Sequence, residues 1–185
     1  MILSANLVVI ANIISSIGLL FFLVSSFVKN RKNVALTQSG NHILNFVAWI
    51  LLGTYSGAVQ EMTSLIRNVF VVIKKQNKIL DIVFIVLGLT LGIVFNVDSW
   101  LGILPIIANC QYSIVILKSN NIVLIKLSMI FSCICWSIYS FVTLNYASAI
   151  FNIVTAIATI VFIIIHTTRK KNAEANTGEA EEIAE

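Results

Sequence analysis

Charged residues are scarce in this chain of 185 residues. They make up 11% of it, whereas apolar residues make up 58%, and the mean hydropathy is +0.97. A soluble globule of this length cannot hide so much apolar surface in its core. The composition therefore excludes a soluble domain and predicts that the apolar surface faces lipid.

Residue types that carry covalent or metal chemistry are also rare, with two histidines and three cysteines in all. The chain contains no HExxH motif, no glycine-rich phosphate loop and no carboxylate pair clustered within one segment. Cys110, Cys133 and Cys135 fall in predicted membrane spans, where we expect them to act as small buried hydrophobes. We therefore predict no enzyme active site, metal site, disulfide or cofactor, and no nucleic-acid partner.

Apolar segments long enough to cross a membrane are what the chain does contain. A helix needs roughly 20 apolar residues, or about 17 at the short end, to cross the hydrocarbon layer. Strands are not expected, because only helices or closed barrels satisfy the backbone in lipid and barrel strands would alternate polar with apolar residues. We predict an all-α membrane protein with seven transmembrane helices, at 4–28, 41–57, 58–73, 79–96, 101–117, 122–143 and 146–166.

Lysine and arginine gather on one side of this topology. They follow the first, third and seventh helices and flank the fifth connection, while the loops around 54–58, 96–100 and 143–146 carry none. The positive-inside rule then places the amino terminus outside and the carboxyl terminus in the cytoplasm. Met1 to Asn6 lacks the basic region of a cleavable signal peptide, so the first helix is expected to remain as an anchor.

The sequence contains an internal repeat. Ile10-Ala11-Asn12, with Ser16, returns 97 positions later as Ile107-Ala108-Asn109 with Ser113, and Tyr55-Ser-Gly-Ala matches Tyr146-Ala-Ser-Ala at an offset of 91. A three-helix unit ends on the side opposite its start, so a direct copy needs one extra helix between the halves.

This pattern predicts two parallel triple-helix bundles related by an axis along the membrane normal. The first repeat covers 1–75, the linker helix 76–98 and the second repeat 99–168. The segment 169–185 is polar and acidic, a composition that cannot bury a core, and we predict that it is a disordered cytoplasmic tail.

Polar residues at helical spacing mark the third and seventh helices. Each costs free energy in lipid unless it faces another helix or water. The two stripes are Gln60, Glu61, Ser64, Arg67 and Asn68, and Ser148, Asn152, Thr155 and Thr159. Together with Asn12 and Asn109 they suit a polar solute lying between the halves. The alternative is that they join helices to one another, at about 0.6 to 2 kcal/mol per contact.

The roles of the aromatic and charged residues in the middle of the predicted spans also have more than one explanation. Trp49, Trp136 and Tyr139 lie away from the interfaces where such rings usually gather, so they either pack in the core or contact a ligand ring. Arg67 is costly in lipid if unpaired. It pairs with Glu61 or Asp81, binds an anionic solute, or extends to the headgroups.

Several short motifs resemble the YgjV-type bacterial inner-membrane family over roughly 5–168. They are Leu51-Leu52-Gly53-Thr54-Tyr55, Ile66-Arg67, Leu104-Pro105 and Cys135-Trp136 with Tyr139. That family is similar to the SWEET sugar transporters and the PnuC vitamin transporters, and Trp136-Ser-Ile-Tyr139 followed by Asn152 resembles the SWEET pattern of Trp, Tyr and a substrate-binding Asn. The resemblance implies a SWEET-like three-plus-one-plus-three fold, a bacterial cytoplasmic membrane location and a transport role.

We therefore expect a facilitator or uniporter for a small polar solute, working by alternating access between the two bundles. The expected pathway residues are Asn12, Asn68, Asn109, Trp136, Tyr139 and Asn152, with Glu61, Arg67 and Asp81 as charged residues inside the membrane. No proton-relay chain is evident, although Glu61 could titrate. The alternative is a non-transporting subunit or scaffold whose stripes bind a partner helix or a second copy of the chain. A polar cavity at mid-depth favours the first hypothesis.

Overall fold

The structure is a computed structural model that describes residues 5–74, 78–96 and 99–184, apart from the side chains at 78, 81, 99 and 170–184. These residues form helices and no strand. The elements are α1 (Ala5–Phe27), α2 (Arg31–Leu51), α3 (Tyr55–Val72), α4 (Lys78–Val94), the short 3-10 helix η1 (Ser99–Gly102), α5 (Ile103–Lys118), α6 (Ile122–Val142) and α7 (Tyr146–Ala184). The predicted all-α fold with seven long helices is confirmed.

Four helical stretches are long and apolar enough to span a membrane: Ala5–Phe27, Trp100–Lys118, Ile122–Val142 and Tyr146–Arg169. Large apolar side chains cover the outside, with Ile79 73% and Phe141 65% exposed, whereas Gln38 and Arg67 are buried. This distribution is the reverse of that in a soluble protein, and it is the one expected where lipid surrounds the chain.

Helix α2 departs from its prediction at both ends. It begins at Arg31, where the side chain of Asn30 caps it by accepting a hydrogen bond from the Lys32 amide at 2.8 Å, and it ends at Leu51. The predicted range of 41–57 was therefore wrong at both ends. The polar residues between 31 and 41 lower the local hydropathy and suggested a loop, but one face of this segment is buried inside the protein.

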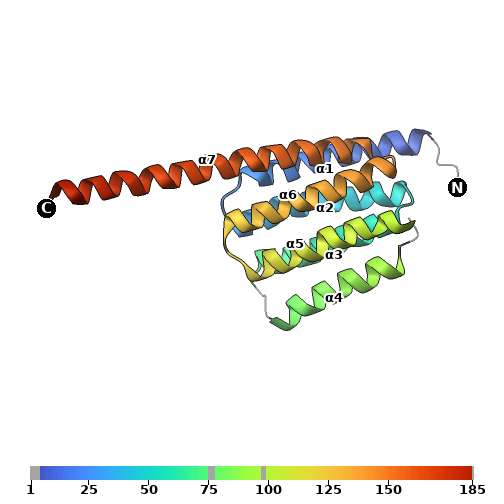
Figure 1. Ribbon diagram of the computed structural model, residues 1–185. Helices are drawn as coiled ribbons and strands as arrows, with labels where there is room; N and C mark the ends of the chain where they lie inside the picture. The colour runs from blue at the N-terminus through green and yellow to red at the C-terminus, as the bar shows by residue number, and fades with distance from the viewer. Residues whose placement is uncertain (1–4, 75–77, 97–98, 185) are drawn as a thin grey trace.

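Helix α7 also departs from its prediction, because its backbone stays helical to Ala184. Figure 1 shows this extension projecting well beyond the other helices. We predicted a disordered tail over 169–185. Low hydrophobicity prevents such a segment from building a core, but its alanine, glutamate and lysine residues are strong helix formers, so it can extend the helix before it.

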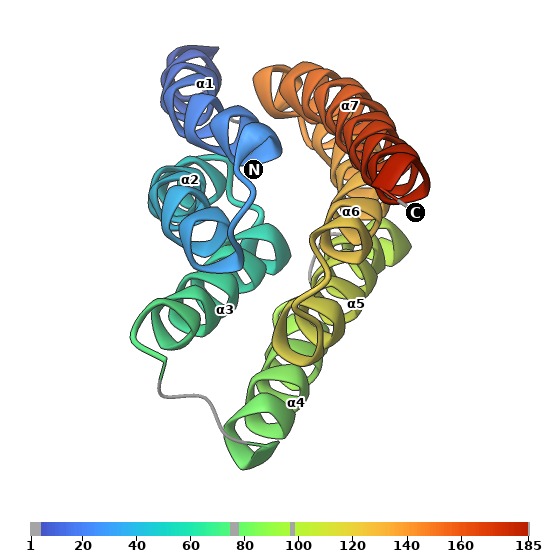
Figure 2. The same ribbon diagram turned by 90° about the vertical axis from the view of Figure 1, so that its left-hand side faces the viewer.

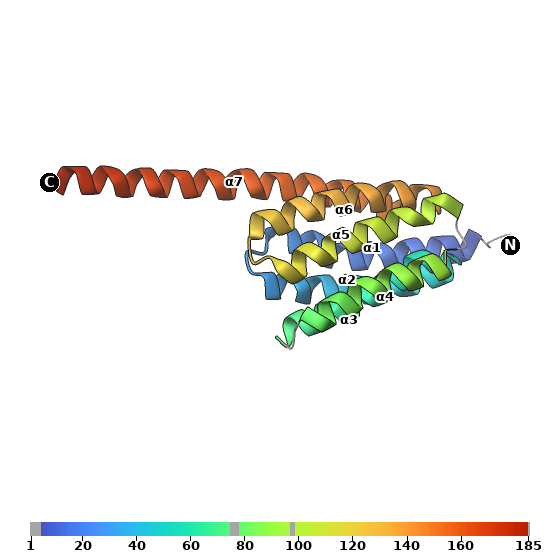
Figure 3. The ribbon, with the colours of Figure 1, turned by 60° about the horizontal axis from the view of Figure 1, so that its bottom comes forward.

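The helices stand in two rows. Seen end-on in Figure 2, α1, α2 and α3 form one row, while α7, α6 and α5 form the other, with α4 beside α5 at its end. The rows meet where α1 packs against α7 and α3 packs against α5. Successive helices run in opposite directions, so α1 begins at one end of the bundle and α7 leaves at the other (Figure 3).

The α2–α3 and α6–α7 turns have the same backbone geometry at an offset of 91. In each, the amide of Thr54 or Asn145 donates to the carbonyl oxygen five residues earlier, at 3.1 and 2.9 Å. Gly53 and Leu144 take matching positive φ angles of 70° and 64°. Glycine adopts this conformation freely, whereas leucine loses roughly 1 to 2 kcal/mol.

Two apolar clusters join the rows at opposite ends. The basic-end cluster lies near the connections rich in lysine and arginine and comprises Ala35, Val71, Tyr112, Ile116, Leu117, Ile125, Met129 and Cys133. The turn-end cluster lies near the two matching turns and comprises Ala11, Ala48, Trp49, Leu52, Ala58 and Tyr139. The space between these clusters is where the polar residues gather.

One lysine is buried at the basic end. Lys126 donates from Nζ to the carbonyl oxygen of Ser25 near the end of α1, and its ammonium lies 5.1 Å from the ring centroid of Phe162 on α7. A cation close to the carboxyl end of a helix is favourably placed in the helix dipole. Lys126 thus ties α6 to α1 and α7.

Candidate functional site

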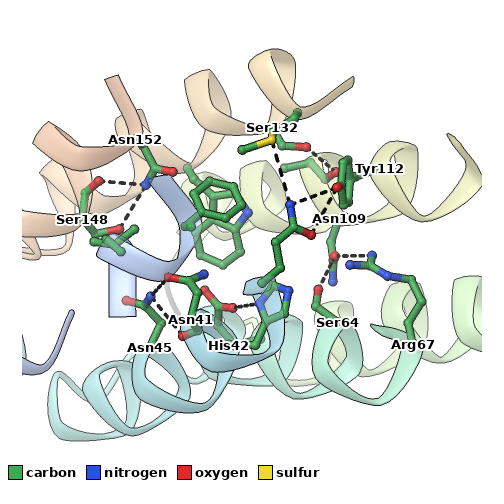
Figure 4. Close-up of a pocket in the computed structure, with 17 residues that line it drawn as sticks. Asn41, His42, Asn45, Ser64, Arg67, Asn109, Tyr112, Ser132, Ser148 and Asn152 are labelled. Atoms are coloured by element: carbon green, nitrogen blue, oxygen red, sulfur yellow. Dashed lines mark hydrogen bonds and ion pairs between the residues drawn. The ribbon is translucent and has the colours of Figure 1, made fainter. Parts of the chain in front are cut away.

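A small cavity lies between the two clusters, and every helix of the two rows except α4 contributes to it. Its volume is about 40 Å³, which is room for about three water molecules. The lining residues are Leu19, Phe22, Gln38, Asn41, His42, Asn45, Glu61, Ser64, Arg67, Ala108, Asn109, Tyr112, Met129, Ser132, Trp136, Ser148 and Asn152. Figure 4 shows that the polar side chains converge on it from both rows.

The repeats contribute equivalent positions to this lining. At an offset of 91, three lining residues of α2 correspond to three of α6: Gln38 to Met129, Asn41 to Ser132 and Asn45 to Trp136. Glu61 on α3 corresponds in the same way to Asn152 on α7. The positions match but the chemistry does not, because the first row supplies the one ionisable group of these four pairs, Glu61, and three of their four amides.

His42 and Glu61 form a buried pair on the cavity wall. The distance from Nδ1 of His42 to Oε2 of Glu61 is 2.5 Å, and no other ion pair occurs among the side chains that the structure describes. Both residues are at least nine-tenths shielded from solvent. His42 Nε2 is buried and has no hydrogen-bond partner among the residues that the structure describes.

Arg67 lies deeper, and amide and hydroxyl oxygens surround its charge. Its guanidinium donates to Oδ1 of Asn109 at 3.1 Å and to Oγ of Ser113 at 2.7 Å, and it also donates to Oδ1 of Asn68 at 3.2 and 3.1 Å. The guanidinium carbon lies 5.2 Å from the centroid of the Tyr112 ring. At 1% exposure, Arg67 does not extend to the headgroups.

Of the two predicted carboxylate partners, Glu61 is not paired with Arg67. Glu61 contacts His42, and the side chain of Asp81 lies outside the described part of the structure. Among the described side chains, no carboxylate oxygen lies within 4.0 Å of the guanidinium. The described hydrogen bonds of the guanidinium are therefore all to neutral amide and hydroxyl oxygens.

Three predicted pathway residues line the cavity. Asn109 accepts from Ser64 at 2.5 Å and donates to Oε1 of Gln60 at 2.7 Å, so it also joins α5 to α3. Asn152 donates to the carbonyl oxygen of Ser148 at 2.8 Å. Trp136 stacks on Trp49, with ring centroids 5.8 Å apart.

The other three lie elsewhere and contact protein. Asn12 donates to the carbonyl oxygen of Leu144 at 3.0 Å and accepts from the Ala147 amide at 2.9 Å, so it holds α1 to the α6–α7 turn. Asn68 donates to the carbonyl oxygen of Ala35 at 3.3 Å in addition to accepting from Arg67. Tyr139 lies in the turn-end cluster, where its hydroxyl accepts from the Gly57 amide at 3.3 Å.

The family model named Imp-YgjV, described as a bacterial inner membrane protein, matches residues 9–171. The chain belongs to this family. Comparisons with curated proteins and with solved structures find no match. Membership in the Imp-YgjV family, together with the apolar helices, identifies a multi-pass protein of the bacterial inner membrane.

Sequence reasoning missed much of the cavity of this Imp-YgjV protein. The second helix was expected to begin at 41, which would put His42 at its end, whereas His42 lies in the middle of α2. Asn41, Asn45 and Gln38 went unrecognised for the same reason. Their spacing of three to four residues is the pattern that identified the stripe on the third helix, and it would have found them.

Helix α2 presents a line of unpaired polar atoms. His42 Nε2, Asn45 Oδ1 and Trp49 Nε1 are all buried and have no hydrogen-bond partner in the described part of the chain, and positions 42, 45 and 49 share one helix face. Leaving a buried polar group unsatisfied costs about 1 to 3 kcal/mol. The line runs from the cavity toward the turn-end cluster and offers hydrogen bonds to water or to a solute.

Proposed function

We propose that this Imp-YgjV protein carries a small polar solute across the inner membrane by alternating access between its two rows of helices. The observation that carries the proposal is the cavity at mid-depth, bordered by both polar stripes and by unpaired polar atoms of α2. Contacts between helices explain buried polar groups that have hydrogen-bond partners, but they do not explain a line of buried polar groups without partners.

The clusters on either side of the cavity would serve as its two closures. At the basic end, Nε2 of Gln38 donates to the hydroxyl of Tyr112 at 3.0 Å, which joins α2 to α5. At the turn end, the Gly57 amide donates to the hydroxyl of Tyr139, which joins α3 to α6. Each closure depends on a tyrosine hydroxyl between the rows, so one can open while the other holds.

The remaining expectations belong to the same proposal. The positive-inside rule favours an amino terminus outside and a carboxyl terminus in the cytoplasm, and in that orientation the basic-end cluster would be the cytoplasmic closure. The role is non-enzymatic, and the partners are the lipid bilayer, a small solute and possible further copies of the chain. The relation to the SWEET and PnuC fold is part of this proposal.

The alternative is a non-transporting subunit whose stripes only join helices. Thr159 favours it locally, since its hydroxyl donates to Ser26 on α1 at 3.1 Å, and Asn12 also joins helices. These contacts lie outside the cavity. A scaffold accounts for them but not for the cavity between Asn45, Glu61 and Asn152.

A proteoliposome uptake screen over sugars, nucleosides, vitamins and amino acids tests the proposal. Asn152→Ala removes an amide from the cavity wall and should lower uptake of the transported solute about tenfold, as expected for one lost hydrogen bond of about 1.4 kcal/mol. Thr159→Ala changes the same stripe outside the cavity and serves as the matched control. If no solute enters, or if both variants lower uptake equally, the scaffold hypothesis is the better one.

A further inference from the structure

The His42–Glu61 pair has no evident structural purpose. It joins α2 and α3, which pack against each other along their lengths and are connected by a short turn. A buried ion pair is a poor way to strengthen such a contact, because desolvation of the two groups offsets their attraction. A pair of amides would join the helices without that cost.

The geometry of the pair leaves one defined atom free to bind a proton. With Nδ1–H donating to the Glu61 carboxylate, His42 is neutral and its Nε2 carries a free lone pair. Nε2 is the buried, unpartnered atom, and His42 lines the cavity. A proton delivered by water in the cavity binds this lone pair, and no other bond breaks. The pair then changes from a net charge of −1 to zero, and release to water reverses the step.

Arg67 sets the charge balance of the cavity. The other titratable or charged side chains that line it, among those described, are Arg67 on α3 and Tyr112 on α5. The lining residues on α1, α6 and α7 are uncharged, and Lys126 on α6 points away to Ser25 and Phe162. The cavity is therefore neutral when His42 lacks the proton and carries one positive charge when His42 holds it.

We propose that the protein moves one proton, bound at Nε2 of His42, together with one small monovalent anion of the carboxylate class. Two states are neutral, namely the empty cavity without the proton and the cavity holding both proton and anion. The half-filled states enclose a net charge, which is costly in a space shielded from water. This inference rests on the proposed carrier function and replaces the expected uniport with cotransport.

Glycolate, lactate and glycerate are suitable probes, with glycerol as the neutral counterpart of glycerate and protein-free liposomes as the baseline. With an acidic exterior, at least one carboxylate should accumulate inside about tenfold for each pH unit of gradient. A membrane potential set with potassium and valinomycin should not change this accumulation, because the loaded and empty cavities are both neutral. An internal pH dye should report acidification at the same rate.

His42→Gln with Glu61→Gln replaces the pair by two amides of similar size and should abolish the gradient-driven accumulation. His166→Gln is the matched control, since His166 stacks on Phe162 of α7 outside the cavity, and it should behave as wild type. A second measurement needs no variant: the carboxylate should raise the Tm of the wild-type protein more at about pH 5.5 than at about pH 8, because the anion and the proton bind together.

The outcomes separate this inference from the carrier function. Accumulation by the double variant equal to that of wild type overturns the inference. So does uptake of neutral solutes alone, independent of pH, and that result leaves the carrier function intact. If no carboxylate enters and none shifts the Tm at either pH, the inference fails, and the carrier function fails with it only when the screen of sugars, nucleosides, vitamins and amino acids also finds no uptake.

Discussion

Removing one hydroxyl should open the basic end of the protein. Gln38 is 0% exposed, and its amide lies 3.0 Å (Nε2) and 3.1 Å (Oε1) from the hydroxyl of Tyr112. Tyr112→Phe keeps the ring that packs beside Arg67 but leaves the Gln38 amide without this partner. An unsatisfied buried group costs about 1 to 3 kcal/mol, which corresponds to a shift of roughly 5- to 150-fold in the opening equilibrium.

The chain carries its own reporter of this opening. Cys133 belongs to the basic-end cluster and is 1% exposed, so a water-soluble maleimide reaches it only when that end opens. With Cys110→Ser and Cys135→Ser as background, the labelling rate of Cys133 is proportional to the open fraction as long as closing outpaces labelling. Tyr112→Phe should therefore raise the rate by the same roughly 5- to 150-fold.

Tyr139→Phe is the control, because it removes a hydroxyl from the turn-end cluster instead. The rate at Cys133 should not rise in this variant. Two results would refute the reasoning: Tyr112→Phe labels no faster than its parent, or both variants label faster to the same extent. The second result would mean that the substitutions loosen the whole bundle.

Four further substitutions test the packing and the role of Asn12. Gly57→Ala should lower the Tm, because the new Cβ would lie 3.0 Å from the buried ring of Trp49 and overpacking costs about 1 to 3 kcal/mol. Gly88→Ala is the control: the nearest neighbours of its new Cβ are 3.9 Å away, so the Tm should stay unchanged or rise. Lys126→Met should keep a Tm close to that of wild type, since an apolar side chain avoids the desolvation of a buried ammonium, and a loss of folding would contradict this. Asn12→Ala should lower the free energy of unfolding by about 1 to 2 kcal/mol in a denaturant titration. Uptake per folded molecule should not change. A loss of uptake without a loss of stability would show that Asn12 belongs to the solute pathway.

Hydropathy was enough to predict helices whose outer faces meet lipid. The first and sixth helices, expected at 4–28 and 122–143, occupy Ala5–Phe27 and Ile122–Val142. Apolar side chains dominate these segments, so the length of the apolar run sets the helix length. The same criterion failed for α2, where the polar face is buried in protein and lowers the local hydropathy without breaking the helix.

Spacing along one helix could not predict which residues each polar side chain contacts. Asn12 and Asn109 belong to the same repeated motif, yet Asn12 caps a turn in the other row whereas Asn109 reaches Ser64 and Arg67. A repeated sequence fixes which face of a helix a side chain occupies. The neighbour on that face depends on how the rows dock, and this information lies in residues far apart in the chain.

The polar interior also constrains how the protein is made. Neither α2 nor α3, both described in full, is among the helices apolar enough to span a membrane on their own. Each central charge such as Glu61 or Arg67 costs about 2.5 to 3.5 kcal/mol when a lone helix leaves the translocon for lipid. Insertion as a hairpin with the two polar faces together, beside α1, would avoid this cost. On that route we expect one wall of the cavity to form during biogenesis, before the second row has left the ribosome.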